Sequence, residues 1–285
     1  MTDNDGWRWK VTDQETSGRM RLRYEPGNWG DVLKALWAIQ IFEQWVSERQ
    51  SGSPAQLGFL DPFAGRPHYP LTPESADRLS RVNRQFDTSP LSTWLDRGLV
   101  PSTGALVSTL AEERGIEFHS TVFDIDPESL DLWSARPRCE ILDVRSGYDA
   151  LRNPEALRAN WILVDPYDLF DSWRKIVKEV VSLAQNRLVL LYLFNKSPRG
   201  EGFFRSYRDL RKTLRHMLQE QNEDAPSAVL GRIPADAILP RAHHEVILLG
   251  PTRSVETLRA PLTDLTEKLA WEIQREGVLE DPTAE

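Results

Sequence analysis

The 285-residue sequence has a single cysteine, Cys139, and no apolar run longer than the seven residues 188–194. One cysteine excludes an intrachain disulfide framework and every zinc site of the Cys-x-x-Cys type. Seven apolar residues fall far short of the roughly 20 that cross a bilayer. The polar, acidic N-terminus lacks the apolar segment of a secretory signal. These absences predict a cytoplasmic protein with no membrane partner.

Excess positive charge is absent too, since the formal net charge is −8. This charge argues against nonspecific coating of a polyanion, although a local basic patch could still bind nucleic acid. Hydrophobic residues make up 40% of the chain and charged residues 27%, which is typical of a globular protein rather than a disordered one. Composition therefore predicts a chain able to build a core and does not indicate its activity.

The order of the predicted elements indicates an α/β fold. Apolar residues recur at helical spacing from Val32 to Val46, after Asn28 as the candidate helix cap, and residues 57–60 predict a short apolar strand. Later strands are expected to end near 122–124, 141–143, 161–165 and 188–195, followed by two weaker strands at 229–233 and 245–249. Helical patterns separate most of them. This alternation predicts a Rossmann-like, doubly wound, mostly parallel sheet covered by helices on both faces.

Three segments are expected to flank or interrupt this sheet. Residues 1–25 read as a partly ordered extension, ahead of a domain at 26–255. Residues 66–101 are rich in proline and polar side chains, and they predict a helical insertion after the first strand, with one helix near 74–86 and no strands. Residues 256–285 predict an acidic, helical C-terminal segment.

Four of the predicted strands are followed by an acid: Asp61, Asp124, Asp143 and Asp165. In a doubly wound sheet all parallel strands end at one edge, where ligands bind. Ionised carboxylates only accept hydrogen bonds, so they suit ribose hydroxyls and an exocyclic amine. Each acid could instead cap the helix that follows. Four acids in corresponding positions favour the ligand interpretation.

The first strand-to-helix turn narrows the choice of ligand. It reads Asp-Pro-Phe-Ala-Gly-Arg-Pro at 61–67, without the Gly-x-Gly-x-x-Gly pattern that seats a pyrophosphate. A Walker A motif is also missing from the sequence. A nucleoside ligand without phosphates, such as S-adenosyl-L-methionine, therefore fits better than NAD or ATP.

The segment Val-Asp-Pro-Tyr at 164–167 looks like the Asp-Pro-Pro-Tyr motif of amino-group methyltransferases. Together with Gly-Asn-Trp-Gly-Asp-Val-Leu-Lys at 27–34 and the turn at 61–65, it resembles the RlmJ-type methyltransferases, which modify an adenine N6 in large-subunit ribosomal RNA. The resemblance extends over residues 24–251. It implies a class I, S-adenosyl-L-methionine-dependent enzyme involved in rRNA processing, with RNA favoured over DNA as partner and with a monomer favoured.

The resemblance also implies roles for individual residues. Asp165 would accept a hydrogen bond from the target amine, with Pro166 beside it, and Tyr167 would stack on an extruded base. The amine would attack the sulfonium methyl in line, so the site orients the amine and polarises it. Combined with the strand-end acids, the candidate cofactor site contains Lys34, Asp61, Phe63, Ala64, Gly65, Thr103, Asp124, Asp143, Ser146 and Gly147.

Departures from the family pattern support a second hypothesis. The second proline of the motif is missing, Ala35 and Phe63 replace two family histidines, and the family Gly-Ala-Gly turn becomes Gly-Arg-Pro at 65–67. A similar turn with Asp-Pro-Tyr or Asp-Pro-Phe also occurs in other methyltransferase-like families, including three-Cys-motif partner proteins. The alternative is therefore a catalytically degenerate, methyltransferase-like protein that serves as a binding or partner subunit.

One stretch of this acidic chain is strongly basic. Residues 187–216 contain eight Lys and Arg against two acids, with Phe203, Phe204 and Tyr207 interleaved. This mixture suits phosphate contacts and base stacking, although most charge runs are solvated helix faces. The candidate nucleic-acid-binding residues are Lys196, Arg199, Arg205, Arg208, Arg211 and Lys212. No metal site is predicted, because His243 and His244 are adjacent on a strand and point to opposite faces.

Overall fold

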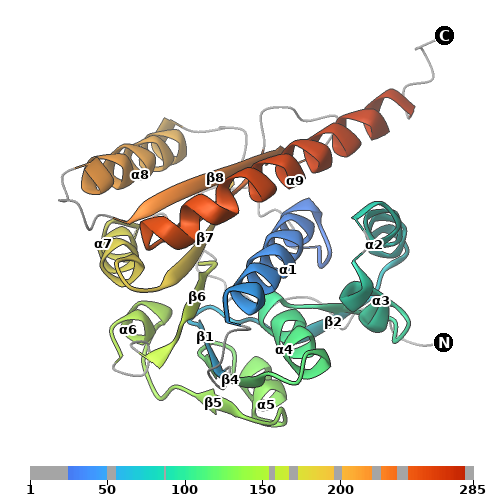
Figure 1. The fold of residues 1–285 in the computed structure, drawn as a ribbon, viewed down its shortest axis with the longest axis horizontal. Coiled ribbons are helices and arrows are strands. Elements are labelled where there is room, and N and C mark those ends of the chain that lie inside the picture. Colours follow the sequence, from blue (N-terminus) through green and yellow to red (C-terminus); the bar gives the residue numbers. More distant parts are fainter. Residues whose placement is uncertain are drawn as a thin grey trace.

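The computed structural model describes residues 25–49, 56–86, 88–153, 158–166, 173–195, 201–219, 226–235 and 243–279. These residues form three layers, with helices on both faces of a central sheet (Figure 1). The predicted Rossmann-like α/β fold is confirmed. Within the described residues, no helix is both long enough and apolar enough to cross a membrane.

The central sheet has seven strands in the order β5-β4-β1-β6-β7-β9-β8. The first five strands in this order are parallel, and β9 runs antiparallel to both of its neighbours. The strands are β1 (Gln56–Asp61), β4 (Glu117–Val122), β5 (Cys139–Ile141), β6 (Trp161–Val164), β7 (Leu188–Asn195), β8 (Ser227–Pro234) and β9 (His243–Gly250). The parallel strands all end at one edge, which is the ligand edge of doubly wound sheets.

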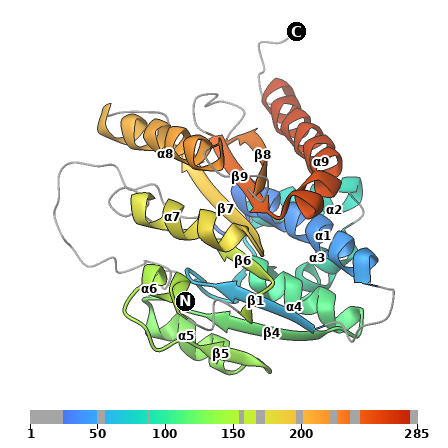
Figure 2. The same cartoon turned by 60° about the vertical axis from the view of Figure 1, so that its left-hand side comes forward.

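Each face of the sheet has its own buried core. Figure 2 shows the helices that cover the two faces. One face packs against α1 (Trp29–Arg49), α4 (Thr103–Glu113), α5 (Pro127–Ser134) and α9 (Thr252–Leu279). The opposite face packs against α6 (Gly147–Leu151), α7 (Trp173–Ala184) and α8 (Glu201–Gln219). Burial on both faces explains why β6 and β7 are almost uniformly apolar in sequence.

Helix α1 begins at Trp29, next to the candidate cap at Asn28. The side chains of Asn28 and Asp31 accept hydrogen bonds from backbone N–H groups around its first turn. Asn28 Oδ1 accepts hydrogen bonds from the N–H groups of Gly30 (2.7 Å) and Asp31 (3.2 Å). Asp31 Oδ2 in turn accepts from the Gly27 N–H at 2.9 Å. This reciprocal arrangement is a variant of the capping box and satisfies N–H groups that lack partners within the helix. It fixes the position of the residues one turn further along, including Lys34.

The insertion between β1 and α4 contains two helices, α2 (Pro73–Phe86) and α3 (Ser89–Leu95). The predicted helix near 74–86 is confirmed. The expectation of no strands in the insertion is wrong, because β2 (His68–Pro70) and β3 (Leu99–Pro101) form an antiparallel pair at its base. Strands of three residues are too short to show an alternating pattern in sequence. They pair because the two ends of the insertion are brought together.

The C-terminal helix α9 is built into the core of the domain. It begins at Thr252 and continues to Leu279, and its buried residues belong to the same apolar cluster as those of α1. Trp37 Nε1–H of α1 donates to Thr266 Oγ1 of α9 at 3.0 Å in a buried hydrogen bond. A Cβ at Gly231 of β8 would lie 2.3 Å from the Trp37 ring, so only glycine fits beside this pair.

We predict that Thr266→Val lowers the free energy of unfolding by about 1–3 kcal/mol, because it leaves the buried Trp37 N–H without an acceptor. The matched control is Thr263→Val on the same helix, where the exposed hydroxyl bonds only to the Arg259 carbonyl. Urea denaturation measures both variants. Equal destabilisation by the two substitutions would contradict a specific role for the Trp37–Thr266 hydrogen bond.

Candidate functional site

The four predicted strand-end acids lie along one edge of the sheet. Asp61 ends β1, Asp165 directly follows β6, and Asp124 and Asp143 come two residues after the ends of β4 and β5. These strands are neighbours in the order β5-β4-β1-β6 and run parallel. Asp124 and Asp165 both lie close enough to Asp61 to influence its pKa. The prediction that these acids gather at one edge is therefore confirmed.

The turn after β1 is tied to the end of β4 through Asp124. Its Oδ2 accepts from the Gly65 N–H and its Oδ1 from the Asp126 N–H, both at 2.8 Å. Gly65 has a φ of +57°, and a Cβ there would lie 2.7 Å from Tyr69 Oη. Burial raises the pKa of Asp124, and the two N–H groups oppose that shift. Each carboxylate oxygen keeps a second lone pair that a ligand hydroxyl can use.

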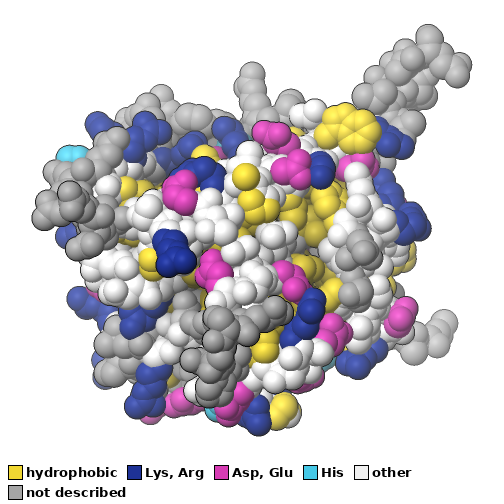
Figure 3. Space-filling view, in the orientation of Figure 1, with side chains coloured by type: hydrophobic (Ala, Val, Ile, Leu, Met, Phe, Trp, Pro, Cys, Tyr) yellow, Lys and Arg dark blue, Asp and Glu magenta, His cyan; other side chains and the backbone are white. Residues whose placement is uncertain are grey.

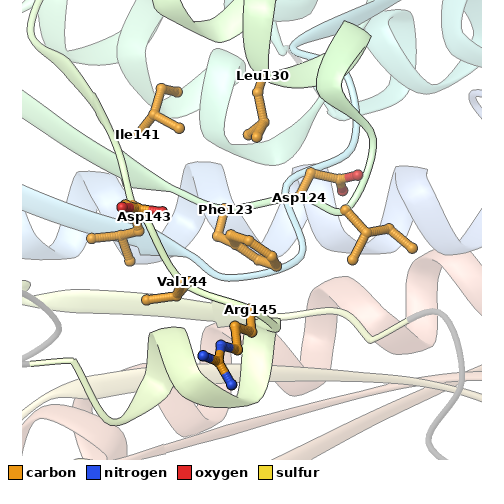
Figure 4. A pocket seen from close by; sticks show the side chains of 9 residues that line it. Phe123, Asp124, Leu130, Ile141, Asp143, Val144 and Arg145 are labelled. Atoms are coloured by element: carbon orange, nitrogen blue, oxygen red, sulfur yellow. The ribbon is translucent and has the colours of Figure 1, made fainter.

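A cavity of about 460 Å³ opens beside Asp124, between the ends of β4 and β5 (Figure 4). Figure 4 shows Asp124 and Asp143 on either side of the Phe123 ring. Ile125, also in the lining, is 84% exposed, which is unusual for a large aliphatic side chain. The sequence analysis missed Ile125, although its position directly after a strand-end acid could have indicated it. The lining consists of Phe123, Asp124, Ile125, Leu130, Ile141, Leu142, Asp143, Val144 and Arg145.

Asp61 differs from the other acids because it is almost completely buried, at 1% exposure. Its Oδ1 accepts from the Phe63 N–H at 3.2 Å. Burial raises the pKa of Asp61 to about 8, although the Phe63 hydrogen bond opposes the shift. The side chain is therefore largely protonated at neutral pH, and its hydrogen bond from the Phe63 N–H stabilises the turn at 62–65.

A buried ammonium group reaches Asp165 from helix α1. Lys34 Nζ forms an ion pair with Asp165 Oδ2 and lies 3.1 Å from Asp31 Oδ1. Burial disfavours the charged ammonium, but Asp165 and Asp31 outweigh it and raise the pKa of Lys34. Burial also raises the pKa of Asp165, and Lys34 opposes that shift. The pair thus favours an ionised carboxylate at the end of β6.

Three ring side chains from β7 and β9 pack beside Lys34: Tyr192, Phe194 and His244. Lys34 Nζ lies 4.4 Å from the centre of the Tyr192 ring, and Tyr192 Oη lies 2.6 Å from His244 Nδ1. Burial lowers the pKa of His244 to about 3, so the imidazole is neutral where it shares a hydrogen bond with Tyr192 Oη. The His244 ring also stacks on Phe194, with ring centres 4.7 Å apart. A Cβ at Gly30 would lie 2.2 Å from Tyr192 Oη, so α1 can approach only with glycine there.

The remaining predicted cofactor residues also lie near the β1 turn. Ala64 N–H donates to the Phe123 carbonyl at 3.0 Å, which aligns the turn with β4. Ser146 caps α6, and a Cβ at Gly147 would lie 2.2 Å from the Pro62 carbonyl oxygen and 2.4 Å from the Phe63 ring. Helix α6 therefore packs directly on the turn. Thr103 is buried at the first position of α4.

Part of the predicted nucleic-acid surface can be located. Figure 3 shows Lys and Arg side chains along the left-hand side of the molecule, where α7 and α8 lie in Figure 1. Arg211 and Lys212 lie on α8, with Lys212 exposed. Tyr167, Lys196 and Arg199 fall outside the described residues, as do the side chains of Arg205 and Arg208.

The two histidines of β9 contact different groups, as expected for adjacent strand positions. His244 bonds to Tyr192, whereas His243 lies on the other side of the sheet, beside Glu245. Among the described residues, no group of three or more His, Cys, Asp and Glu is placed to hold a metal ion.

Comparisons with known proteins identify the fold. No protein-family model matches the chain, and no curated protein matches it. Protein LPL1258 from Legionella pneumophila, which carries the family model DUF519, has a TM-score of 0.64 at 12% identity, covering 88% of this chain and 94% of that one. This similarity shows a shared fold. The RlmJ-type resemblance stays a prediction.

Two weaker structural matches are S-adenosylmethionine-dependent methyltransferases or bind that cofactor. A putative class I methyltransferase from Listeria monocytogenes has a TM-score of 0.41 at 10% identity, covering 90% of this chain and 74% of that one. Aeropyrum pernix fibrillarin, with natively bound S-adenosyl-L-methionine, has a TM-score of 0.34 at 11% identity, covering 74% and 76% of the two chains.

We predict that Asp61→Asn raises the free energy of unfolding above that of wild type, and that this difference grows as the pH rises. Between its ordinary pKa of 3.8 and about 8, the folded wild type keeps a proton on Asp61 that the unfolded chain releases, so wild-type stability falls across this range. Asparagine does not ionise, so the variant gains on the order of a few kcal/mol over wild type at pH 8 and little at pH 4.

Urea denaturation of both proteins between pH 4 and pH 8 measures this difference. Asp143→Asn, at an exposed position of the same edge, is the control. A stability difference between Asp61→Asn and wild type that stays constant with pH would contradict the protonated state of Asp61.

Proposed function

We propose that this protein binds S-adenosyl-L-methionine and methylates an exocyclic amine, adenine N6 in RNA. The observation that supports this most directly is the arrangement of two features on one sheet edge. A cavity lies beside Asp124 and Asp143, and a carboxylate paired with a buried lysine, Asp165, lies two strands away from Asp124.

The residues around the cavity fit an adenosyl ligand without phosphates. Its volume of about 460 Å³ falls within the range of roughly 300–1,000 Å³ typical of small-molecule sites. Asp124 can accept from ribose hydroxyls, and Asp143 can accept from the adenine amine. Ile125 offers an exposed apolar surface for the flat adenine ring. When bound, S-adenosyl-L-methionine supplies an electrophilic methyl group on its sulfonium.

Asp165 would hold the target amine in position for attack. As a carboxylate it accepts an N–H from the amine and directs the nitrogen lone pair toward the methyl group. Lys34 supports this role because its positive charge favours the ionised form of a carboxyl whose pKa burial raises. Pro166 adjoins Asp165 at the end of β6, and Tyr167 would stack on the extruded base.

The basic surface of α8 supports a nucleic-acid substrate over a free nucleoside. Lys and Arg neutralise backbone phosphates and release counterions, which accounts for much of the affinity for nucleic acids. Arg211 and Lys212 lie on this helix together with Arg205 and Arg208, and Lys196 and Arg199 precede it in sequence. The preference for RNA, and for a role in rRNA processing, rests on the resemblance to RlmJ-type enzymes.

One observation favours the second hypothesis, a binding or partner subunit without activity. The Lys34 ammonium already bonds to Asp165 Oδ2, the group that would receive the substrate amine. In a degenerate site, this ion pair would serve only to hold α1 against β6. Cofactor binding without methyl transfer to RNA or DNA would support the second hypothesis over the first.

We predict that Asp165→Ala abolishes methyl transfer, by about 10²–10³-fold or more, while binding of S-adenosyl-L-methionine remains close to wild type. The carboxylate contacts the amine and lies away from the adenosyl cavity, which explains the separation. Incorporation of radiolabelled methyl into total cellular RNA and DNA measures transfer, and calorimetry measures cofactor binding. Asp264→Ala, at an exposed position of α9, is the control. Unchanged turnover would remove Asp165 from the mechanism.

We predict that Ile125→Ala weakens S-adenosyl-L-methionine binding about fivefold, because it removes roughly 1 kcal/mol of apolar contact with the adenine. Leu132→Ala is the matched control, since Leu132 is also an exposed aliphatic residue, at 38%, but is absent from the cavity lining. Calorimetric titration of both variants distinguishes them. Equal affinities in the two variants would place the adenine elsewhere.

A further inference from the structure

The α8 side of the sheet contains a buried carboxylate that the proposed reaction does not use. Glu245 of β9 is 0% exposed, and neither of its oxygens accepts a hydrogen bond of good geometry from the described residues. Its Oε1 instead lies 3.0 Å from the imidazole Nε2 of His243 and forms ion pairs with Arg232 Nε at 3.5 Å and Arg211 Nη1 at 3.6 Å. Burial raises the pKa of Glu245 to about 7. A buried charge is costly unless it is paired, so the two guanidinium groups stabilise the ionised form of this carboxyl.

The register of the sheet places this cluster near the proposed reaction site. Arg232 of β8 lies directly opposite Glu245, and Glu245 lies opposite Leu193 of β7. Leu193 is two residues beyond Leu191, which pairs with Val164 at the end of β6. The cluster therefore lies at the same strand-end edge as Asp165, two strands across, which corresponds to about 10 Å between backbones. It lies on the sheet face covered by α8, whereas Lys34 reaches Asp165 from the α1 face.

The two arginines extend from the buried carboxylate to the surface. Arg211 is 33% exposed and Arg232 is 53% exposed, whereas Glu245 is fully buried. Burial lowers the pKa of Arg232, and the nearby positive charge of Arg211 lowers it further. Arg215 has the same secondary effect on Arg211. Several cations thus converge on one carboxyl group whose pKa is about 7, which leaves local positive charge beside the site.

We propose that Arg211 and Arg232, held in position by the buried Glu245, bind the phosphodiester backbone of the nucleic-acid strand whose base enters the Asp165 site. A guanidinium presents its N–H groups in a rigid fork that matches the oxygens of a phosphate, and both arginines reach solvent from a fixed base. The link to base methylation rests on the proposed function. Arg232 and Glu245 both lie outside the basic run at 187–216. The proposed site therefore combines Arg211 of α8 with residues of β8 and β9.

The test measures binding of a 20-nucleotide single-stranded RNA by fluorescence anisotropy over a series of salt concentrations, without cofactor. We expect Arg211→Gln and Arg232→Gln each to weaken binding about tenfold at low salt and to reduce the salt slope by about 0.7. Arg259→Gln on α9 is the matched control, because Arg259 is 46% exposed and also paired with a glutamate, Glu256. The control should bind RNA like wild type.

Glu245→Gln separates positioning from net charge. At pH 8, above the Glu245 pKa of about 7, the variant is more positive than wild type, so an effect of net charge alone would tighten RNA binding. If Glu245 positions the arginines, its removal weakens binding, which we expect to be about fivefold. Because this substitution is buried, thermal unfolding checks that the variant folds. Arg232→Lys provides a second test, since it keeps the charge but loses the fork, and it should bind more weakly than wild type.

Three results would overturn the proposal: no RNA binding by wild type, wild-type affinity and salt slope in both arginine variants, or tighter binding by a folded Glu245→Gln. Methyl transfer and cofactor binding are measured separately. If RNA binding depends on Arg211 and Arg232 while no transfer occurs, the phosphate site stands and the proposed reaction fails.

Discussion

The structure of the candidate site depends on the ion pair between Lys34 and Asp165. A carboxylate buried at the end of a strand would normally take up a proton, since desolvation raises its pKa. Helix α1 opposes this shift by delivering an ammonium group from 131 positions earlier in the chain. That delivery depends on the cap at Asn28 and on Gly30, which lets α1 approach Tyr192. The pKa of Asp165 thus depends both on burial and on where helix α1 begins and docks.

The elements that sequence predicts well are those with a strong local signal. The cap at Asn28 and the apolar spacing from Val32 to Val46 locate α1, and the acids that follow β1, β4, β5 and β6 lie together because parallel strands end at a common edge. The contacts within the site carry no comparable signal. Lys34 and Asp165 meet only because α1 packs across the sheet, and the exposure of Ile125 depends on the loop between β4 and α5.

Adjacent residues of strand β9 lie on opposite faces of the sheet and therefore contact different groups. His244 faces α1 and completes the Tyr192 contact, whereas His243 and Glu245 face α8 and contact Arg232. The sequence analysis separated the two histidines on the period of a strand, which is a local rule. It gave no role to Glu245, because only the antiparallel insertion of β9 between β7 and β8 brings arginines from two other elements to it.

The Lys34–Asp165 pair is compatible with catalysis as well as with a purely structural role. A carboxylate offers about four lone-pair positions on two oxygens, and Lys34 bonds to only one oxygen, Oδ2. A substrate N–H can therefore bond to Asp165 while the ammonium stays in place. An ionised acceptor also binds an N–H more strongly than a protonated one, because charge-assisted hydrogen bonds are roughly twice as strong as neutral ones. In the proposed reaction, the lysine that pairs with Asp165 at this edge would thus also favour the carboxylate form that accepts an amine N–H.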